Sequence, residues 1–321
     1  MALAPQLVNK LRMPIVAAPM FLVSGPELVI AACRAGIVGS FPALNQRQTK
    51  GYEDWLIQIR DGLQQAVQDG QRSALYAVNL IVHHSNSRLH VDLEMTVKYE
   101  VPLVITSLGI DRSVVDAVHS YGGLVFHDVV NMRFAEKALY AGVDGLIAVC
   151  AGAGGHAGTY NPFAFITELR AFTDKTILAA GAITNGASIL AAQACGADLA
   201  YIGTRFIVAK EALAKPHYQQ MLLESSAKDI VYTSKISGVP ANFLQASIEA
   251  AGLDLNLSTT PKMNMAEELD SGTTAWVDIL SAGQGVGGIS RIDNMAQICS
   301  QLSKEYDAAL ARLNVSRALF R

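Results

Sequence analysis

Short apolar runs alternate along the chain with segments in which apolar residues recur at helical spacing. Trp55, Ile59, Leu63 and Val67 follow one another at intervals of four residues, as on one face of a helix. A helix predicted over 27–35 begins after Gly25-Pro26 and ends at Gly36, because proline suits a first helical turn and glycine suits a helix end. Eight apolar runs that are too short for helices predict strands at 13–20, 37–41, 75–81, 101–107, 124–127, 144–149, 176–180 and 198–202.

This alternation predicts an α/β fold built from repeated βα units, a (β/α)8 TIM barrel. An open doubly wound sheet also alternates strands with helices, but eight units, with glycines after the seventh and eighth strands, favour the barrel. The alternation of strand-like and helix-like segments ends after Phe206. Residues 210–281, called here the capping segment, are therefore predicted to form a smaller, mostly helical domain over the barrel mouth. The barrel is expected to comprise residues 1–209 and 282–321, with a final helix over 294–313 on its wall.

Composition narrows the class of protein. The 321 residues are 51% hydrophobic and 17% charged, with a formal net charge of -3, which indicates an extensive core and argues against nucleic acid as the main ligand. No apolar stretch approaches the roughly 20 residues that span a bilayer, and residues 1–12 lack the pattern of a signal peptide. Four scattered cysteines without close histidine partners predict neither disulfides nor a zinc site. We therefore expect a cytoplasmic protein, a monomer or homodimer, without metal or membrane partners.

The densest chemical signal is the glycine-rich loop, residues 150–159, which follows the sixth predicted strand. It holds four glycines and His156. Glycines let the backbone approach a flat ligand closely, and imidazole suits proton transfer or anion recognition near neutral pH. A flexible surface loop with an incidental histidine is the plainer interpretation. Cys150 at its start is either a reactive thiol or a packing residue.

Other candidates stand at the ends of predicted strands, where barrel active sites lie. Small residues after strands seven and eight, in AAGAI and IGTRF, predict phosphate binding by backbone N–H groups ahead of helices; tight turns alone are the alternative. Asn79 can both donate and accept hydrogen bonds, although such a residue is also common in turns. His127 and Asp128 form a polar pair at the end of strand five, and either could be structural. His83, His84 and His90 are interpreted as part of a solvated loop that could line the substrate entrance, with a metal site as the alternative.

Five motifs in this order, MPIVAAPM, GVDGLIAVCAGAGGHAGT, ILAAGAIT, YIGTRF and SAGQGVGG, resemble the nitronate monooxygenase family, formerly 2-nitropropane dioxygenases. The likeness runs from about Met13 to Ser290. Its relatives include FMN-dependent enoyl-ACP reductases and an NADH:quinone reductase. The resemblance implies an FMN-bearing TIM barrel with a smaller domain over the mouth, and it places His156 at the catalytic histidine. The cofactor-binding residues that it implies, with Asp128 at the flavin pyrimidine, are Ala18, Pro19, Met20, Asn79, Asp128, Gly154, Ala180, Gly181, Ala182, Gly203, Thr204, Gln284 and Gly285.

The chain departs from the family pattern at three places. Asp128 stands where some relatives have a lysine near the flavin pyrimidine, which puts a cation at that edge in doubt. The loop before His156 reads Cys-Ala-Gly-Ala where relatives often have a glutamate. The turn after strand seven is Gly-Ala where Gly-Gly is common, and it should still admit a phosphate.

Three functions follow as hypotheses. The first is oxidation of alkyl nitronates or nitroalkanes by FMN and O2 to carbonyl compounds and nitrite, with His156 as base or nitro-group ligand. The second is an FMN-dependent NAD(P)H reductase of quinones or enoyl thioesters, which no separate dinucleotide motif supports. The third is a barrel that binds a phosphorylated metabolite without catalysis. The natural substrate and the electron donor are not determined by the sequence.

Overall fold

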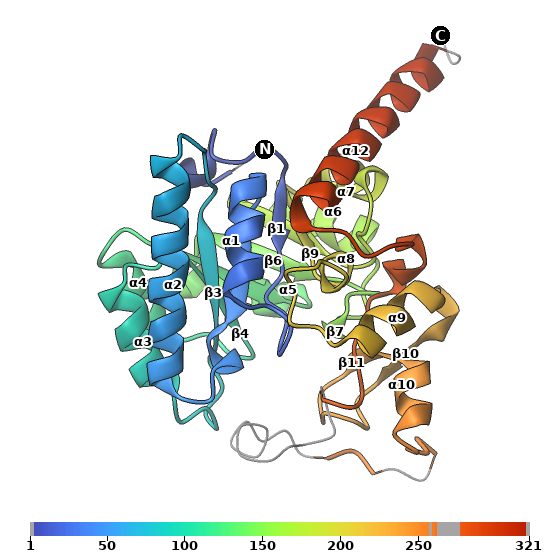
Figure 1. The fold of residues 1–321 in the computed structure, drawn as a ribbon, viewed down its shortest axis with the longest axis horizontal. Coiled ribbons are helices and arrows are strands. Elements are labelled where there is room, and N and C mark those ends of the chain that lie inside the picture. The colour runs from blue at the N-terminus through green and yellow to red at the C-terminus, as the bar shows by residue number, and fades with distance from the viewer. Residues whose placement is uncertain (1–2, 257–258, 262–276, 319–321) are drawn as a thin grey trace.

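The computed structural model describes residues 3–256, 259–261 and 277–318. Eight parallel strands form one sheet in the order β1-β9-β8-β6-β5-β4-β3-β2, and a parallel bridge between Val16 and Val38 closes it into a ring (Figure 1). The predicted (β/α)8 barrel is thus confirmed. Its strands are β1 (Ile15–Ala17), β2 (Gly39–Pro42), β3 (Tyr76–Ile81), β4 (Leu103–Ser107), β5 (Leu124–Val129), β6 (Gly145–Val149), β8 (Thr176–Ala180) and β9 (Leu199–Ile202).

Helices cover the outside of the ring, and α1, α2 and α12 lie close to the segments in which the sequence predicted helices. Gly36 and Gly142 end two of them with φ of 88° and 96°, as expected for glycine at a helix C-terminus. The last helix packs between α7 and α1 and fills the eighth position of the wall, and its far end extends beyond the body of the molecule (Figure 1). These helices are α1 (Pro26–Ala35), α2 (Thr49–Gln68), α3 (Leu89–Lys98), α4 (Arg112–His119), α5 (Met132–Ala141), α6 (Pro162–Phe172), α7 (Gly186–Ala194), α8 (Thr204–Ile207) and α12 (Met295–Ala318).

Alternation along the strands divides the core into two layers. Leu103 and Ile105 belong to the cluster inside the barrel, whereas Val104 between them packs in the layer under the helices. Residues near the N-terminus close the barrel floor: Leu7 joins the inner cluster, and the Ala4 N–H donates to Thr176 Oγ1 at the start of β8 (2.9 Å). The carboxyl ends of the strands, at the opposite end of the barrel, are therefore where a ligand can enter.

The capping segment combines helices with strands that local periodicity did not predict. It contains α9 (Pro216–Glu224), β10 (Ile230–Thr233), β11 (Ala241–Leu244) and α10 (Gln245–Ala250). β11 pairs antiparallel with β10 on one side and with β7 (Gly155–His156), inside the glycine-rich loop, on the other. β10 and β11 pair with each other across a short turn and are only four residues long each, too short for a clear alternation, whereas the partner of β11 in β7 lies far away in the sequence. Residues 262–276 of this segment lie outside the described residues.

Candidate functional site

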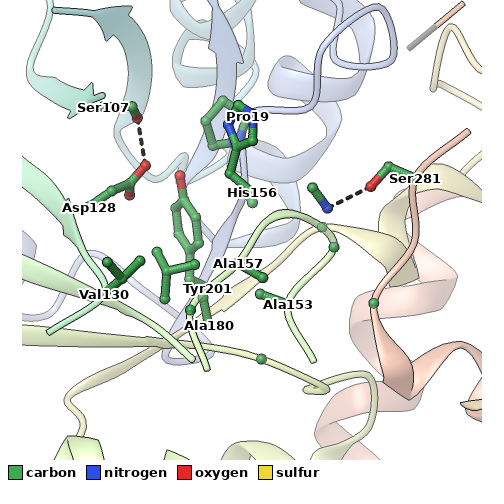
Figure 2. Close-up of a pocket in the computed structure, with 18 of the residues that line it drawn as sticks. Pro19, Ser107, Asp128, Val130, Ala153, His156, Ala157, Ala180, Tyr201 and Ser281 are labelled. Atoms are coloured by element: carbon green, nitrogen blue, oxygen red, sulfur yellow. Dashed lines mark hydrogen bonds between the residues drawn. The ribbon is translucent and has the colours of Figure 1, made fainter. Parts of the chain in front are cut away.

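A cavity of about 930 Å³ lies at the carboxyl ends of the barrel strands, between the ring and the capping segment (Figure 2). The ring contributes residues from β2, β3, β4, β5, β6, β8 and β9 and from the turn directly after β1, and the glycine-rich loop contributes most of its length. Tyr218, Tyr232, Pro240 and Ser281 line it from the capping segment. This volume lies in the upper part of the range for small-molecule and cofactor sites.

All but one of the residues that the sequence placed at the site line this cavity. They are Ala18, Pro19, Met20, Asn79, Asp128, Gly154, His156, Ala180, Gly181, Ala182, Gly203, Thr204 and Gly285. Gln284 is the exception: its side chain is exposed and its backbone N–H donates to the Gly152 carbonyl (2.9 Å). Gln284 therefore fastens the back of the glycine-rich loop and does not face the cavity.

His156 projects from the glycine-rich loop into the cavity (Figure 2). Its backbone pairs with Ala241 of β11, so the capping segment holds the residue on one side. Burial lowers the pKa of the imidazole to about 4, because removal from water disfavours the charged form. At neutral pH the ring is therefore neutral and able to accept a proton.

The turns after β8 and β9 form what we call the turn wall: Ala180, Gly181, Ala182, Gly203 and Thr204. Gly181 has φ of +139°, and a Cβ there would lie 2.8 Å from the Ala151 carbonyl oxygen, so only glycine fits. A Cβ on Gly203 would instead meet nothing closer than 3.7 Å, which leaves its backbone bare toward the cavity beside Ala18 and Met20. Thr204 Oγ1 accepts from the Gly283 N–H (2.9 Å) and keeps its own proton to donate. This wall offers backbone and a hydroxyl group, with little side-chain bulk.

The opposite side, which we call the side-chain wall, comprises Asn79, Ser107, His127 and Asp128. Asn79 Nδ2 donates to the Ile105 carbonyl (3.1 Å) and to Ser107 Oγ (2.8 Å), and Ser107 Oγ donates to Asp128 Oδ2 (2.6 Å; Figure 2). Both amide protons of Asn79 are thereby used. The sequence allowed this residue to donate and accept toward a ligand, but the structure leaves only Oδ1, an acceptor.

Asp128 ends this chain of hydrogen bonds. Its Oδ1 is buried and has no hydrogen-bond partner among the described residues. Burial raises the pKa of the carboxyl group to about 6, and the bond from Ser107 opposes that rise. Figure 2 shows the Tyr201 hydroxyl group directed toward it, and burial together with the charge of Asp128 raises the pKa of that phenol well above its usual value.

The other polar candidates are neutral or lie outside the cavity. His127 Nδ1 is 2.8 Å from Thr106 Oγ1, and burial lowers the pKa of this imidazole to about 4. Cys150 is buried, and burial raises its thiol pKa to about 12, which fits a packing residue. The ring centroids of His83 and His84 lie 4.1 Å apart with the rings tilted by 42°, and neither residue lines the cavity. Among the described residues, no cluster of three or more His, Cys, Asp or Glu side chains is placed to hold a metal ion.

The lining suits a flat ring with polar edges and an anionic tail. Bare backbone at Gly203 and a free hydroxyl proton on Thr204, next to the start of α8, favour an anionic group at the turn wall. Met20 lies beside Gly203 and offers a polarizable side chain to a ring. The unpartnered Asp128 Oδ1 and the acceptor Oδ1 of Asn79 supply polar atoms at the other end. These are the features that a flavin requires.

Several lining residues were not predicted. Ser107 stands at the end of β4, and its position at a strand end was a usable signal, whereas Tyr201 lies within β9. Tyr218, Tyr232 and Pro240 belong to the capping segment, where no periodicity or motif marked them, and Ser281 begins the SAGQGVGG motif but was not named as a site residue. Within the described parts of the chain, none of the helices combines the length and apolar composition needed to cross a bilayer.

Comparison with known proteins agrees with this geometry. The profile of the nitronate monooxygenase family matches residues 53–305. A nitronate monooxygenase of Paraburkholderia phytofirmans is 30% identical over 285 residues, covering 75% of this chain and 76% of that protein.

Solved structures share the fold. A nitroalkane oxidase from Streptomyces ansochromogenes superposes with a TM-score of 0.81 at 23% identity, covering 96% of this chain and 99% of the other. FabK from Thermotoga maritima gives a TM-score of 0.80 at 22% identity, covering 95% and 96%. At these identities the likeness concerns the fold.

Proposed function

Because the chain belongs to the nitronate monooxygenase family, whose members are flavin-dependent oxidoreductases, we propose that it uses FMN and O2 to oxidise alkyl nitronates to carbonyl compounds and nitrite. The observation that carries this proposal is the neutral, buried imidazole of His156 in the same cavity as the turn wall. Bound FMN supplies the redox chemistry. The protein supplies the position of the reactants and the proton transfer.

Different residues of the cavity would bind the cofactor and the substrate. Gly181, Ala182, Gly203 and Thr204 would hold the phosphate, Ala18 to Met20 would face the ring, and Asn79 and Asp128 would meet its polar edge. His156 would bind the nitro oxygens of a nitronate, or remove the α-proton from a neutral nitroalkane. Proton removal leaves an imidazolium beside an anionic nitronate, and this opposite charge raises the imidazole pKa just when the ring must hold the proton.

Replacement of His156 by asparagine tests the catalytic role. We expect His156→Asn to retain bound FMN but to lose about 10²- to 10⁴-fold in nitroethane turnover, the usual contribution of a general base. Oxygen uptake with nitroethane and with preformed ethyl nitronate measures the loss, and the flavin absorbance of the purified variant checks cofactor retention. Turnover equal to that of the wild-type protein would remove His156 from the mechanism.

Addition of NADH under nitrogen tests the reaction class. We expect the flavin absorbance to persist, while ethyl nitronate with O2 gives nitrite. Rapid bleaching by NADH without nitronate-dependent oxygen uptake would instead identify a reductase of quinones or enoyl thioesters. Failure of the protein to bind FMN would favour a non-catalytic barrel that binds a phosphorylated metabolite.

A further inference from the structure

The glycine-rich loop is held by two different parts of the molecule. Its first residues are fastened to the barrel: the Cys150 N–H donates to the Ala180 carbonyl (2.9 Å), and the Gly152 carbonyl accepts from the Ala182 N–H (3.2 Å). From the Ala153 carbonyl to Ala157, the hydrogen-bond partners outside the loop come from the capping segment. The boundary between the two sets of contacts lies three residues before His156.

Two side chains of the capping segment make the central contacts. Asn242, which is 2% exposed, donates from Nδ2 to the Ala153 carbonyl (2.7 Å). Ser281 Oγ accepts from the Gly155 N–H (2.6 Å; Figure 2) and donates to the Asn242 carbonyl (2.9 Å), so the two residues are linked to each other.

Backbone contacts continue this arrangement on the far side of the histidine. β11 pairs with β7 across Gly155 and His156, and the Ala157 N–H donates to the Pro240 carbonyl (3.2 Å). Tyr232 donates its hydroxyl proton to the Ala157 carbonyl (3.1 Å). The stretch around His156 is therefore held by β11, by the flanking Pro240 and by the neighbouring β10.

We propose that Asn242 and Ser281 are positioning residues that hold the His156 imidazole in its reactive orientation, so that the capping segment sets the geometry of the catalytic loop. The proposal rests on the role given to His156 above. Gly154 and Gly155 precede the histidine, and glycines leave the backbone many conformations unless contacts restrict it. Misplacement of a catalytic group by about 1 Å can cost about 10²-fold in rate, so loss of these contacts should lower the rate of proton removal by His156.

The test uses the flavin-loaded full chain and a matched control. Ser281→Ala removes the acceptor for Gly155, Asn242→Leu removes the donor to Ala153 with little change of shape, and Ser281→Thr keeps the hydroxyl group. Ser247→Ala is the control, because Ser247 is a fully buried serine of the same segment that exchanges hydrogen bonds with the backbone of Leu244 and Leu280 and not with the loop. Each variant is measured for the pKa of His156 by imidazole NMR, assigned through His156→Asn, and for kcat with nitroethane relative to ethyl nitronate.

We expect Ser281→Ala and Asn242→Leu each to lower the nitroethane-to-nitronate kcat ratio by about 10-fold or more, because only nitroethane requires proton removal. The His156 pKa should rise toward the ordinary value of about 6.5 as water reaches the ring. Ser281→Thr and Ser247→Ala should leave both quantities unchanged.

An unchanged ratio and pKa in Ser281→Ala and Asn242→Leu would overturn the proposal, as would equal changes in Ser247→Ala, which would indicate general loosening of the segment. If the wild-type protein oxidises neither nitro compound, the proposed function fails, yet the NMR comparison still decides whether these residues position His156. If Ser281→Ala does not fold, Asn242→Leu supplies the same readouts.

Discussion

The turn wall meets the cavity with backbone and small side chains, whereas the side-chain wall meets it with Asn79, Ser107, His127 and Asp128. The first is fixed by conformation: Gly181 adopts a φ that other residues avoid, and there is no room for a Cβ. The second is fixed by a directed chain of hydrogen bonds that ends on a titratable carboxyl group. Substitutions that add bulk to the turn wall should therefore change flavin binding and stability independently of pH. The contribution of the side-chain wall to stability should depend on pH and less on bulk.

The largest effect is expected from a side chain added to the turn wall. Gly181→Val should abolish flavin retention and lower the free energy of unfolding by about 1–3 kcal/mol, because it forces both a strained φ and a clash with the Ala151 carbonyl. Flavin absorbance per protein and urea unfolding measure the two effects.

Gly287→Ala is the control for this substitution, since a Cβ there meets nothing closer than 3.5 Å and the residue does not line the cavity. It should keep both flavin and stability. A Gly181→Val protein that is fully loaded and as stable as the wild type would show that the turn wall tolerates side chains after all.

An intermediate effect, dependent on pH, is expected at the side-chain wall. The pKa of Asp128 is raised to about 6, so between about pH 4 and 6 the folded protein keeps a proton that the unfolded chain has released. The contribution of Asp128 to the free energy of unfolding therefore falls as pH rises through this window, by at most about 3 kcal/mol, and is constant above it.

Asp128→Asn should remove this fall. Urea unfolding of the flavin-saturated wild type and variant at half-unit steps from pH 4 to 7 gives the difference curve that isolates the residue. A difference that does not vary with pH would mean that Asp128 keeps an ordinary pKa. The side-chain wall would then differ from the turn wall in geometry but not in pH dependence.

The smallest effect is expected from one hydroxyl group of the turn wall. Thr204→Val removes the acceptor for the Gly283 N–H and should weaken flavin binding by about 1 kcal/mol, or about five-fold in Kd. Thr204→Ser keeps the oxygen and should bind as the wild type does. Flavin fluorescence titration at pH 6 and 8 measures both, and a loss that changed with pH would contradict a purely geometric wall.

Much of the turn wall could be predicted from the sequence, and little of the side-chain wall's organisation could. Glycines after the seventh and eighth strands have a local cause, because each strand must turn tightly into its helix. Asn79 and Asp128 were placed near strand ends correctly. No sequence pattern indicates that Ser107 lies between them, or that Asn79 donates both amide protons to barrel residues. Gln284 was expected to face the cavity because its motif does, yet its side chain is exposed on the back of the loop.

The order of strands and helices, the barrel and the position of His156 after β6 were determined by the chain itself, since hydrophobic period and turn chemistry act over a few residues. Tertiary structure alone decided what holds that histidine. The bond from the Gly155 N–H to Ser281 Oγ joins residues 126 positions apart, and β7 exists only because β11 lies beside it. Contacts between such distant segments leave no periodic trace in either one, so only the folded chain could reveal them.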